Sequence, residues 1–198
     1  GPYYDRLLDF LHSPSLCVDK LARLWTALVV ANHTRLMFVN GRIVVLGDGI
    51  KVPKAGRKMP GVKHLYQGGE SNTKPEYILG HSCQAIAVLA GGLASFTAIP
   101  LAARIHEGLV FSNRDQRTLL DKMVLLLKRL AIDRPYYFVA DAYYASRKIA
   151  LPLLNMGQHL VTRARSNAVG YLPAPRPETP RRGRPKLYGE RVPLKSLF

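Results

Sequence analysis

The spacing of apolar residues at the start of the chain is typical of amphipathic helices. Between residues 3 and 12, Leu7, Leu8 and Leu11 recur at helical spacing, and the segment Ser13-Pro14-Ser15 ends the pattern. A second helix is predicted from a cap at Ser15 to about residue 33, with one apolar face formed by Leu21, Leu24, Trp25 and Leu28. We therefore expect residues 1–35 to form an N-terminal helical lobe, in which residues 1–2 are the remnant of a cleaved expression tag.

After residue 35 the apolar runs are more continuous, as is typical of β-strands. Runs at residues 36–39 and 42–46 flank Asn40-Gly41, which is a hairpin signal, and we expect the second of these strands to end at Asp48. Two longer runs, at residues 77–90 and 95–104, are joined by a glycine pair and predict two antiparallel strands.

The next part of the chain alternates between helices and strands. A cap at Asn113 or Asp115 predicts a helix that ends near Ala131. A buried strand at residues 136–140 follows, then a helix that starts at Ser146, and then a strand at residues 159–162.

Three strands followed by a helix, a strand, a helix and a strand predict an α/β fold. Three antiparallel strands that lead into parallel strands give a mixed sheet, and we expect helices on both of its faces. This order resembles the ribonuclease-H-like fold, with residues 36–165 as a partial core that is truncated at its C-terminus. Residues 166–198 are rich in Pro and Arg, so we expect a basic, extended and mobile insertion or linker there.

Composition adds a strong preference for a polyanion. The 198 residues suit one domain, and 29 Lys and Arg against 13 Asp and Glu give a formal charge of +16. A small domain this basic usually binds nucleic acid, although solubility or ribosome-like packing is an alternative. Cys17 and Cys83 match no disulfide framework or zinc spacing, which favours a reducing cytoplasm. No apolar run is long enough to span a bilayer, so we expect no membrane partner.

Two aspartates each follow an apolar, strand-like run. Asp48 lies in Leu46-Gly47-Asp48-Gly49, and Asp141 directly follows the run that ends at Ala140. If the two strands are neighbours, both carboxylates can hold one divalent cation, and carboxylate oxygens suit Mg²⁺ or Mn²⁺. In a basic chain the natural substrate of such a site is a phosphodiester, which indicates a nuclease or a transposase. Taken alone, Asp48 is also typical of a turn, and Asp141 of a helix cap.

A basic segment directly follows the first aspartate. Residues 49–69 contain no acidic residue, and their Pro and Gly content makes regular structure unexpected. We interpret this segment as a loop that contacts the phosphates of DNA entering the site, with a solvated surface loop as the alternative. Its cations are Lys51, Lys54, Arg57, Lys58 and Lys63.

Other residues are candidates for DNA contacts, each with a structural alternative. His81 lies on a predicted strand, where it either touches DNA or packs. A tyrosine at 143 or 144 can stack on an unpaired base, while core packing is expected for at least one of the pair. The arginines of a C-terminal Arg-Gly-Arg-Pro string suit a narrow minor groove, with a solvated linker as the alternative. The residues of these last two groups are Tyr143, Tyr144, Arg182, Arg184 and Lys186.

Several strings in order resemble the bacterial insertion-sequence transposases of the DDE type. Residues 47–54, 56–63 and 74–81 carry the resemblance around the first aspartate. Residues 141–146 are similar to the second acidic motif of these enzymes, and residues 182–189 to a later segment. The resemblance covers residues 42–198, most of the chain.

The resemblance implies a ribonuclease-H-like catalytic domain that cleaves transposon ends and transfers the strands to target DNA. Two Mg²⁺ ions, for which Mn²⁺ can substitute, would lie between three acidic residues, and Asp48 and Asp141 match the first two. It further implies DNA as partner, a homodimer of the full-length protein, and a cytoplasmic, nucleoid-associated bacterial location.

The third acidic residue of the family has no convincing match. Glu178 and Glu190 lie in the Pro/Arg-rich segment rather than on an amphipathic helix. We expect the third carboxylate beyond Phe198, which predicts that this chain is inactive alone. The alternatives are a non-catalytic DNA-binding module derived from a transposase, and another ribonuclease-H-like nuclease, for which the lysine-rich loop would not be expected.

Overall fold

The structure is a computed structural model that describes residues 2–56, 59–66, 75–92, 95–106, 117–164, 167–175, 183–184 and 186–197. Its helices are α1 (Pro2–His12), α2 (Val18–Asn32), α3 (Leu119–Leu130) and α4 (Arg147–Asn155), with short 3-10 turns η1 (Ala142–Tyr144) and η2 (Leu194–Leu197). Its strands are β1 (Phe38–Val39), β2 (Arg42–Pro53), β3 (Lys63–Tyr66), β4 (Tyr77–Gly92), β5 (Ser95–His106), β6 (Tyr136–Ala140), β7 (His159–Thr162), β8 (Val169–Pro173) and β9 (Tyr188–Pro193).

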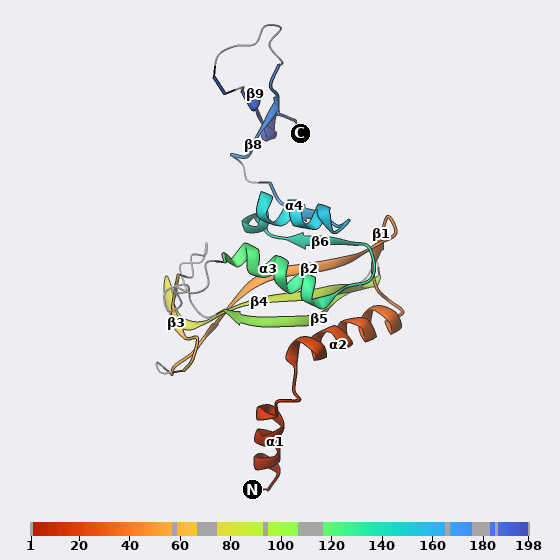
Figure 1. Ribbon diagram of the computed structural model, residues 1–198, viewed down its shortest axis with the longest axis vertical. Coiled ribbons are helices and arrows are strands. Elements are labelled where there is room, and N and C mark those ends of the chain that lie inside the picture. The colour runs from red at the N-terminus through yellow and green to blue at the C-terminus, as the bar shows by residue number, and fades with distance from the viewer. Residues whose placement is uncertain are drawn as a thin grey trace.

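The main sheet has seven strands and mixes parallel with antiparallel pairs (Figure 1). Its central path runs β3-β4-β2-β6-β7, with β1 paired to β2 and β5 paired to β4. β4 is antiparallel to both β2 and β5, whereas β2, β6 and β7 are parallel to one another. Three antiparallel strands therefore lead into a parallel β6-α4-β7 unit, and the predicted ribonuclease-H-like mixed α/β fold is confirmed.

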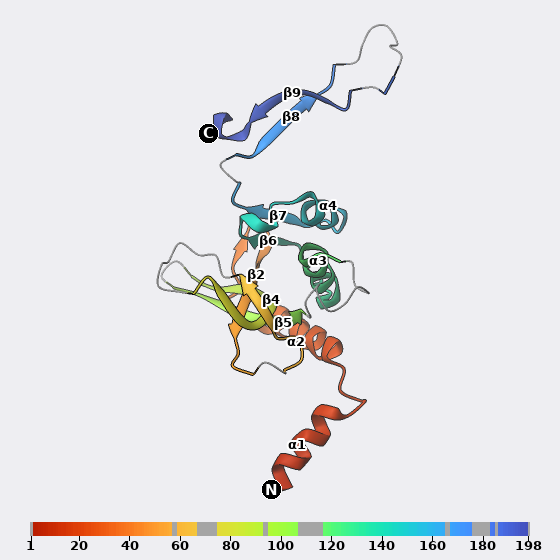
Figure 2. The same cartoon turned by 90° about the vertical axis from the view of Figure 1, so that its left-hand side faces the viewer.

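Helices α2, α3 and α4 cover one face of this sheet, whereas helices on both faces were expected (Figure 2). α2 contacts α3, and α3 contacts α4. The reason lies in the handedness of the connections. β5 is parallel to β6, and both crossovers, β5-α3-β6 and β6-α4-β7, step across the sheet in the same direction. Right-handed crossovers that step in one direction place their helices on the same face.

The core lies between these helices and the sheet. Alternate residues of the central strands point into it, and they include some of the most deeply buried side chains of the chain. In β4 the burial alternates from Gln84 to Ala90, with the intervening residues only half-buried. The fully buried positions include Ile43, Val45, Ile86, Val88, Phe138, Met123, Ile149 and Leu153.

α3 begins later than the sequence predicted. Its cap is Thr118, which forms a capping box with Asp121: the Thr118 hydroxyl accepts from the Asp121 N–H, and the Asp121 carboxylate accepts from the Thr118 N–H. Asn113 and Asp115, the expected caps, lie outside the described residues. The helix ends where expected, with Ala131 in the left-handed region at φ 49°.

The N-terminal helices form as predicted, but α2 packs through a different face. Its buried residues are Thr26, Val29 and Val30, whereas Leu21 and Leu24 are more than half exposed. One cause of this orientation is a hydrogen bond. The Trp25 indole N–H donates to the Pro100 carbonyl of β5 at 2.8 Å and so fixes which face of α2 meets the sheet. The helix also starts at Val18 after Cys17, rather than after the expected cap at Ser15.

Two expectations about irregular segments are wrong for the described residues. β2 continues past Asp48 to Pro53, because β4 extends far enough to pair with it, and residues 63–66 form β3. The segment expected as a linker contains an antiparallel pair, β8 and β9, that projects from the sheet (Figure 2). The rings of Tyr171 and Tyr188 pack across this pair with centroids 5.2 Å apart, a contact that offsets the high proline content. None of the described helices is long and apolar enough to cross a membrane.

Candidate active site

The register of the parallel pair β2 and β6 brings Asp48 and Asp141 together. The last paired residues are Gly47 and Ala140, and each aspartate directly follows one of them. Neighbouring strands of a sheet lie about 4.8 Å apart, so the two aspartates occupy adjacent backbone positions. This places both predicted metal ligands at one end of the parallel pair, although only β6 ends there.

Side-chain alternation directs both carboxylates away from the helices. A Cβ added at Gly47 would meet the Phe138 ring at 2.3 Å and the Met123 side chain at 3.4 Å, so this position faces α3. The next residue along the strand, Asp48, therefore starts on the opposite face, and Asp141 does so after Ala140 by the same rule. The face they share is the one that the described helices leave uncovered (Figure 2).

Gly47 is required at this position because the aromatic ring beneath it leaves no space for a side chain. The absence of a Cβ lets Phe138 pack directly under the β2 backbone, next to the aspartate that follows. The Gly47-Asp48 pair thus combines close packing on one face of the sheet with a carboxylate on the other.

Local hydrogen bonds orient each carboxylate through one of its oxygens. Asp48 Oδ1 accepts from the Gly49 N–H at 2.7 Å, and Asp141 Oδ1 accepts from the Tyr143 N–H at 3.1 Å, which caps η1. Both residues are exposed, and no salt bridge joins either of them to a basic residue in the described part of the chain. Two exposed carboxylates with further oxygens to offer form a donor set that fits a hard divalent cation.

Tyr144 lies buried against Phe138 on the helix-covered face, close enough to both aspartates to sense their charges. Burial raises the pKa of its phenol to about 12, and the negative charges of Asp48 and Asp141 add to that increase. The Gln84 side-chain amide donates to the Tyr144 hydroxyl at 3.3 Å and to the Leu119 carbonyl at 2.8 Å. Because this hydroxyl accepts from Gln84, its own proton remains available for donation. Tyr144 is therefore neutral at neutral pH, and its hydroxyl lies on the helix-covered face, under the strand ends from which the two carboxylates project on the other face.

Tyr143 has the opposite environment, and the expectation that one of the tyrosines packs in the core is confirmed for Tyr144. The Tyr143 ring is about half exposed and meets the Tyr144 ring edge-on, with centroids 5.3 Å apart. It lines a cavity of about 650 Å³ together with Thr162 and Val169 of the neighbouring strands. The Thr162 hydroxyl donates to the Asp141 carbonyl at 2.7 Å, so this cavity adjoins the second aspartate.

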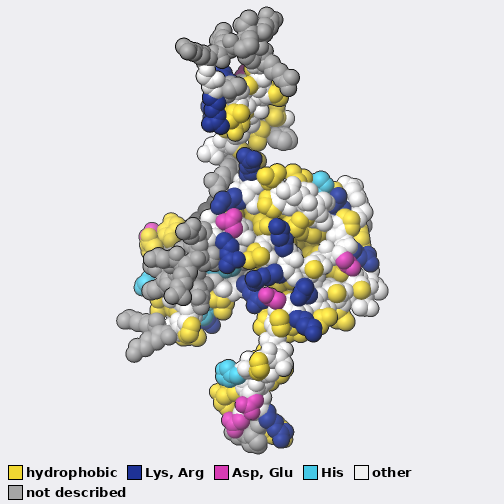
Figure 3. Space-filling view, viewed as in Figure 1, with side chains coloured by type: hydrophobic (Ala, Val, Ile, Leu, Met, Phe, Trp, Pro, Cys, Tyr) yellow, Lys and Arg dark blue, Asp and Glu magenta, His cyan; other side chains and the backbone are white. Residues whose placement is uncertain are grey.

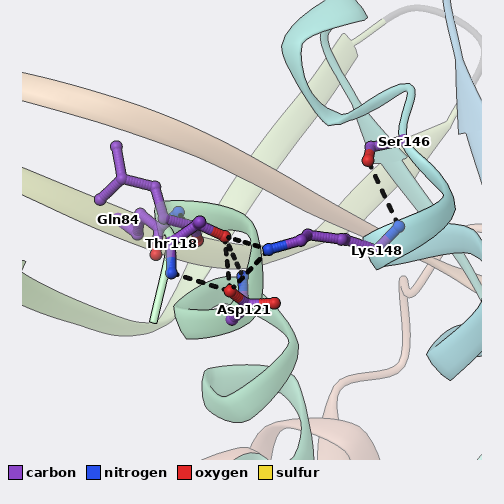
Figure 4. Close-up of polar contacts among 6 residues, drawn as sticks. Gln84, Thr118, Asp121, Ser146 and Lys148 are labelled. Atoms are coloured by element: carbon purple, nitrogen blue, oxygen red, sulfur yellow. Dashed lines mark hydrogen bonds and ion pairs between the residues drawn. The ribbon is translucent and has the colours of Figure 1, made fainter. Parts of the chain in front are cut away.

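A polar cluster near Gln84 ties α4 to the start of α3 (Figure 4). Lys148 of α4 forms an ion pair with Asp121 at 3.2 Å and contacts the Thr118 hydroxyl at 3.5 Å. Hydrogen bonds from Thr118 lower the pKa of the Asp121 carboxyl, and Lys148 lowers it further. Ser146 accepts from the Lys148 N–H at 3.3 Å, as its predicted role of helix cap requires. These contacts fix η1 and α4 relative to the helix that covers the core.

The predicted DNA-binding residues differ in where the structure places them. Lys51 extends from β2, and its ammonium donates to the Tyr66 carbonyl of β3. Lys54 follows β2 and is half-buried, while burial and the nearby Lys122 lower the pKa of Lys63. Arg57 and Lys58 lie outside the described residues.

His81, Arg184 and Lys186 lie away from the two aspartates. His81 is 7% exposed, and its Nε2 lies 2.9 Å from the Pro60 carbonyl, which favours its role in packing the segment before β3. Arg184 and Lys186 precede β9, in the part of the chain that projects from the sheet. Arg182 lies outside the described residues.

A third acidic ligand is not found beside the pair. Within the described ranges, no three His, Cys, Asp or Glu side chains lie close enough together to hold a metal ion. Glu190 lies on β9, and Glu178 is outside the described residues. The described site is therefore a pair of carboxylates.

A comparison with known families identifies the family of the chain. The sequence profile described as "DDE superfamily endonuclease" matches residues 2–196, nearly the whole chain. The chain belongs to the DDE superfamily endonucleases. This match confirms the DDE-type family that the sequence motifs predicted.

Other comparisons are more distant. The DDE endonuclease is similar to the piggyBac transposase in a cryo-EM structure of its synaptic complex with hairpin DNA, with 17% sequence identity and a TM-score of 0.41. The match covers 72% of this chain and 26% of the piggyBac chain, so the DDE endonuclease spans about a quarter of that protein. No curated protein matches the sequence significantly.

The sequence did not single out Gln84, which contacts Tyr144 beneath the site. Gln84 interrupts the apolar run of β4, and a single polar residue on the buried face of a strand is a signal that it binds another buried group.

Proposed function

We propose that this DDE endonuclease is the catalytic domain of a DNA transposase that cleaves transposon ends and transfers the cleaved strands to target DNA. The observation that carries the proposal is the adjacent placement of Asp48 and Asp141 after paired residues of two parallel strands. Membership of the DDE endonucleases supports it.

In the proposed site Asp48 and Asp141 bind Mg²⁺, for which Mn²⁺ can substitute. When bound, divalent ions of this kind activate an attacking oxygen and stabilise the leaving oxygen of a phosphodiester. The N–H groups of Gly49 and Tyr143 hold one oxygen of each carboxylate, which leaves the second oxygens for the metal. Tyr144, whose hydroxyl accepts from Gln84 in the core, holds η1 and with it Asp141 against the sheet.

The proposed substrate is DNA, held by the positive charge of the segment that follows Asp48. Lys51, Lys54 and Lys63 lie on β2 and β3 or next to them, and Arg57 and Lys58 belong to the same segment of the sequence. In this proposal they neutralise backbone phosphates without reading sequence. The exposed ring of Tyr143, beside the cavity next to Asp141, suits stacking on an unpaired base. A homodimer of the full-length protein on paired ends completes the proposal.

We further propose that a third carboxylate completes the metal site, since the described residues provide two. The 198-residue chain alone then binds the second ion poorly and does not cleave DNA. Metal-dependent nicking of a transposon-end duplex by this purified chain would contradict that part of the proposal while leaving the two aspartates in place.

The decisive experiment removes one carboxylate charge at a time in the full-length protein. Asp48→Asn and Asp141→Asn are each expected to abolish Mg²⁺- and Mn²⁺-dependent cleavage and to leave DNA affinity intact. Asp133→Asn is the matched control, because Asp133 is an exposed aspartate just before β6, at the other end of that strand. Strand transfer by Asp141→Asn at the level of the control would refute the catalytic role.

A non-catalytic DNA-binding module is the second candidate, and the pair of carboxylates without a described third ligand favours it. Mn²⁺ anomalous diffraction separates the two. A peak between Asp48 and Asp141 supports the nuclease, whereas DNA binding without a metal peak and without cleavage by the full-length protein supports the module.

A further inference from the structure

The sheet holds one of the two proposed metal ligands less firmly than the other. Ala140 is the last residue of β6 that pairs with β2 and with β7, so Asp141 is the first residue beyond both ladders. Asp48, in contrast, pairs with Ala85 inside the long antiparallel pair of β2 and β4. A single 3-10 turn such as η1 is short and has poorer hydrogen-bond geometry than an α-helix. The direction of the Asp141 carboxylate therefore depends on contacts from outside η1.

A side chain of β7 holds the backbone of Asp141. The Thr162 hydroxyl donates to the Asp141 carbonyl at 2.7 Å. The same carbonyl accepts from the Tyr144 N–H at 3.1 Å, but that donor belongs to η1 and moves with the turn. Thr162 is the last residue of β7 and pairs with Ala140, so the sheet sets its position. The hydroxyl thus ties the start of η1 to a strand.

This bond reaches the carboxylate through the backbone. Asp141 has ψ 175°, and rotation about this torsion moves its carbonyl oxygen and the N–H groups that follow. Because Ala140 is fixed in the ladder, a bond that holds the carbonyl oxygen also fixes the position of the Tyr143 N–H. That N–H donates to Asp141 Oδ1 at 3.1 Å. The position of the carboxylate therefore depends on the Thr162 hydroxyl.

The Thr162 side chain starts on the face opposite to the one from which the carboxylate projects. Thr162 pairs with Ala140, and Ala140 pairs with Gly47. A Cβ added at Gly47 would face the Phe138 ring, on the helix-covered side. Paired residues of neighbouring strands direct their side chains to the same face of a sheet. The hydroxyl can therefore hold the residue without occupying a carboxylate oxygen.

The other end of η1 is held separately. The Tyr144 ring meets the Phe138 ring edge-on with centroids 6.4 Å apart, and its hydroxyl accepts from Gln84 of β4. Thr162 and Tyr144 thus hold the two ends of the turn from β7 and from the core. Tyr144 is a large buried side chain, whereas Thr162 is half-buried, so the hydroxyl of Thr162 can be removed with less effect on the core.

The groups that hold Asp141 are neutral. Lys and Arg side chains gather over the helix-covered face in Figure 3, and the ion pairs of the described residues join such cations to Asp19 and Asp121. The described donors to Asp141 are the N–H groups of Tyr143 and Tyr144 and the Thr162 hydroxyl. Neutral donors orient a carboxylate and leave its negative charge for a divalent cation.

We propose that Thr162 is a positioning residue of the metal site, whose hydroxyl holds the Asp141 backbone so that the Asp141 carboxylate lies beside Asp48 when an ion binds. The inference rests on the proposed function for the ion, whereas the hydrogen bond can be measured without metal. Loss of a hydrogen bond that orients a metal ligand typically lowers metal affinity by about 10- to 100-fold. Because Thr162 acts through the backbone, the lower end of that range is expected.

The test separates the hydroxyl of Thr162 from its shape. Thr162→Val removes the hydroxyl and keeps a β-branched side chain, whereas Thr162→Ser keeps the hydroxyl. Thr97→Val is the matched control, because Thr97 is an exposed threonine on β5. Mn²⁺ binding to each 198-residue chain is titrated by electron paramagnetic resonance. Hydrogen exchange of the Tyr143 amide is measured by NMR without metal, and thermal unfolding shows whether each variant folds.

Thr162→Val is expected to weaken Mn²⁺ binding by about tenfold and to speed exchange of the Tyr143 amide, while the amides of β2 and β4 keep their rates. Thr162→Ser should restore both quantities, and Thr97→Val should leave both unchanged. In the full-length protein, Thr162→Val should raise the Mn²⁺ concentration needed for half-maximal cleavage without changing DNA affinity in EDTA. This pattern supports the positioning role.

Other outcomes overturn it. Unchanged Mn²⁺ affinity in Thr162→Val refutes the role of Thr162 and leaves the proposed function in place. An equal loss of affinity in Thr162→Ser shows that the hydroxyl is not the cause, and faster exchange throughout β2 and β4 shows a general loss of stability instead. If the unsubstituted chain binds no Mn²⁺, the proposed metal site fails, and the role of Thr162 fails with it.

Discussion

The two faces of the central sheet differ in what their residues do. On the helix-covered face, Ile43, Val45 and Phe138 are fully buried and interlock with α3 and α4. On the other face, alternate residues such as Leu46 and Val139 are half-buried, and Asp48 and Asp141 project from it. Stability therefore depends on one face and the proposed chemistry on the other, and adjacent residues of one strand should respond very differently to substitution.

The largest expected contrast is between neighbours on β6. Phe138→Ala empties a fully buried ring position and should lower the free energy of unfolding by about 3–5 kcal/mol. Val139→Ala, on the half-buried opposite face, should cost about 1 kcal/mol or less, because less surface is lost. Urea unfolding followed by circular dichroism measures both. Similar losses for the two variants would mean that the open face is covered in solution.

Gly47 packs on Phe138 directly before Asp48, and adding a methyl group at Gly47 tests how close this packing is. A Cβ at this position would lie 2.3 Å from the Phe138 ring, so Gly47→Ala must displace the ring and should destabilise the fold by about 1–3 kcal/mol. Gly92→Ala is the control, since a Cβ there meets no atom within 4 Å. Equal unfolding midpoints for the two variants would show that the sheet accommodates a side chain at Gly47.

Tyr144 packs on the helix-covered face, and removing its hydroxyl tests the hydrogen bond that joins η1 to β4 there. Tyr144→Phe keeps the ring but removes the acceptor for Gln84, and should cost about 1 kcal/mol of unfolding free energy. Tyr143→Phe, at an exposed ring, is expected to change stability by less. A stability gain in Tyr144→Phe would indicate that the buried hydroxyl is poorly satisfied.

The smallest expected effect is a pH dependence at the junction of α3 and α4. The pKa of Asp121 is lowered in the fold, chiefly by hydrogen bonds from Thr118, so its carboxylate stabilises the native state above the ordinary aspartate pKa. That contribution is lost as the pH falls below about 4 and the carboxyl becomes protonated. Thermal unfolding of Asp121→Asn should show a flatter acid limb than the unsubstituted chain. Parallel limbs would exclude a stabilising role for this carboxylate.

The sequence correctly predicted the elements whose two ends are marked by local sequence signals. Residues 136–140 and 159–162 are β6 and β7 as predicted, because each is a short apolar run with a clear break on both sides. The helix after Ser146 was also predicted, since its cap is local. Membership of the DDE family and the adjacency of Asp48 and Asp141 followed from motifs that are local in sequence.

Features that depend on distant partners were missed. β2 extends past Asp48 because β4 is present to pair with it, and the sequence of β2 alone does not indicate this pairing. The apolar face of α2 with Leu21 and Leu24 remains exposed because the bond from Trp25 to β5 and the ion pairs of Asp19 orient the helix. A cavity of about 230 Å³ between β5 and α3 is lined by Arg104 from the strand and by Lys122 and Arg129 from the helix, so no local sequence pattern could predict it.

The two aspartates are attached to the fold by different means. Asp48 lies within β2, and the residues before and after it in this strand all pair with β4. Asp141, in contrast, lies at the start of a three-residue turn. The first carboxylate is consequently as rigid as the sheet, while the second can move with η1 without breaking a strand pair. The separation of the two carboxylates is therefore adjustable at Asp141 only. Substitution of an exposed residue of the turn such as Tyr143, rather than the buried Tyr144, is expected to change which ion the proposed site accepts without altering the core.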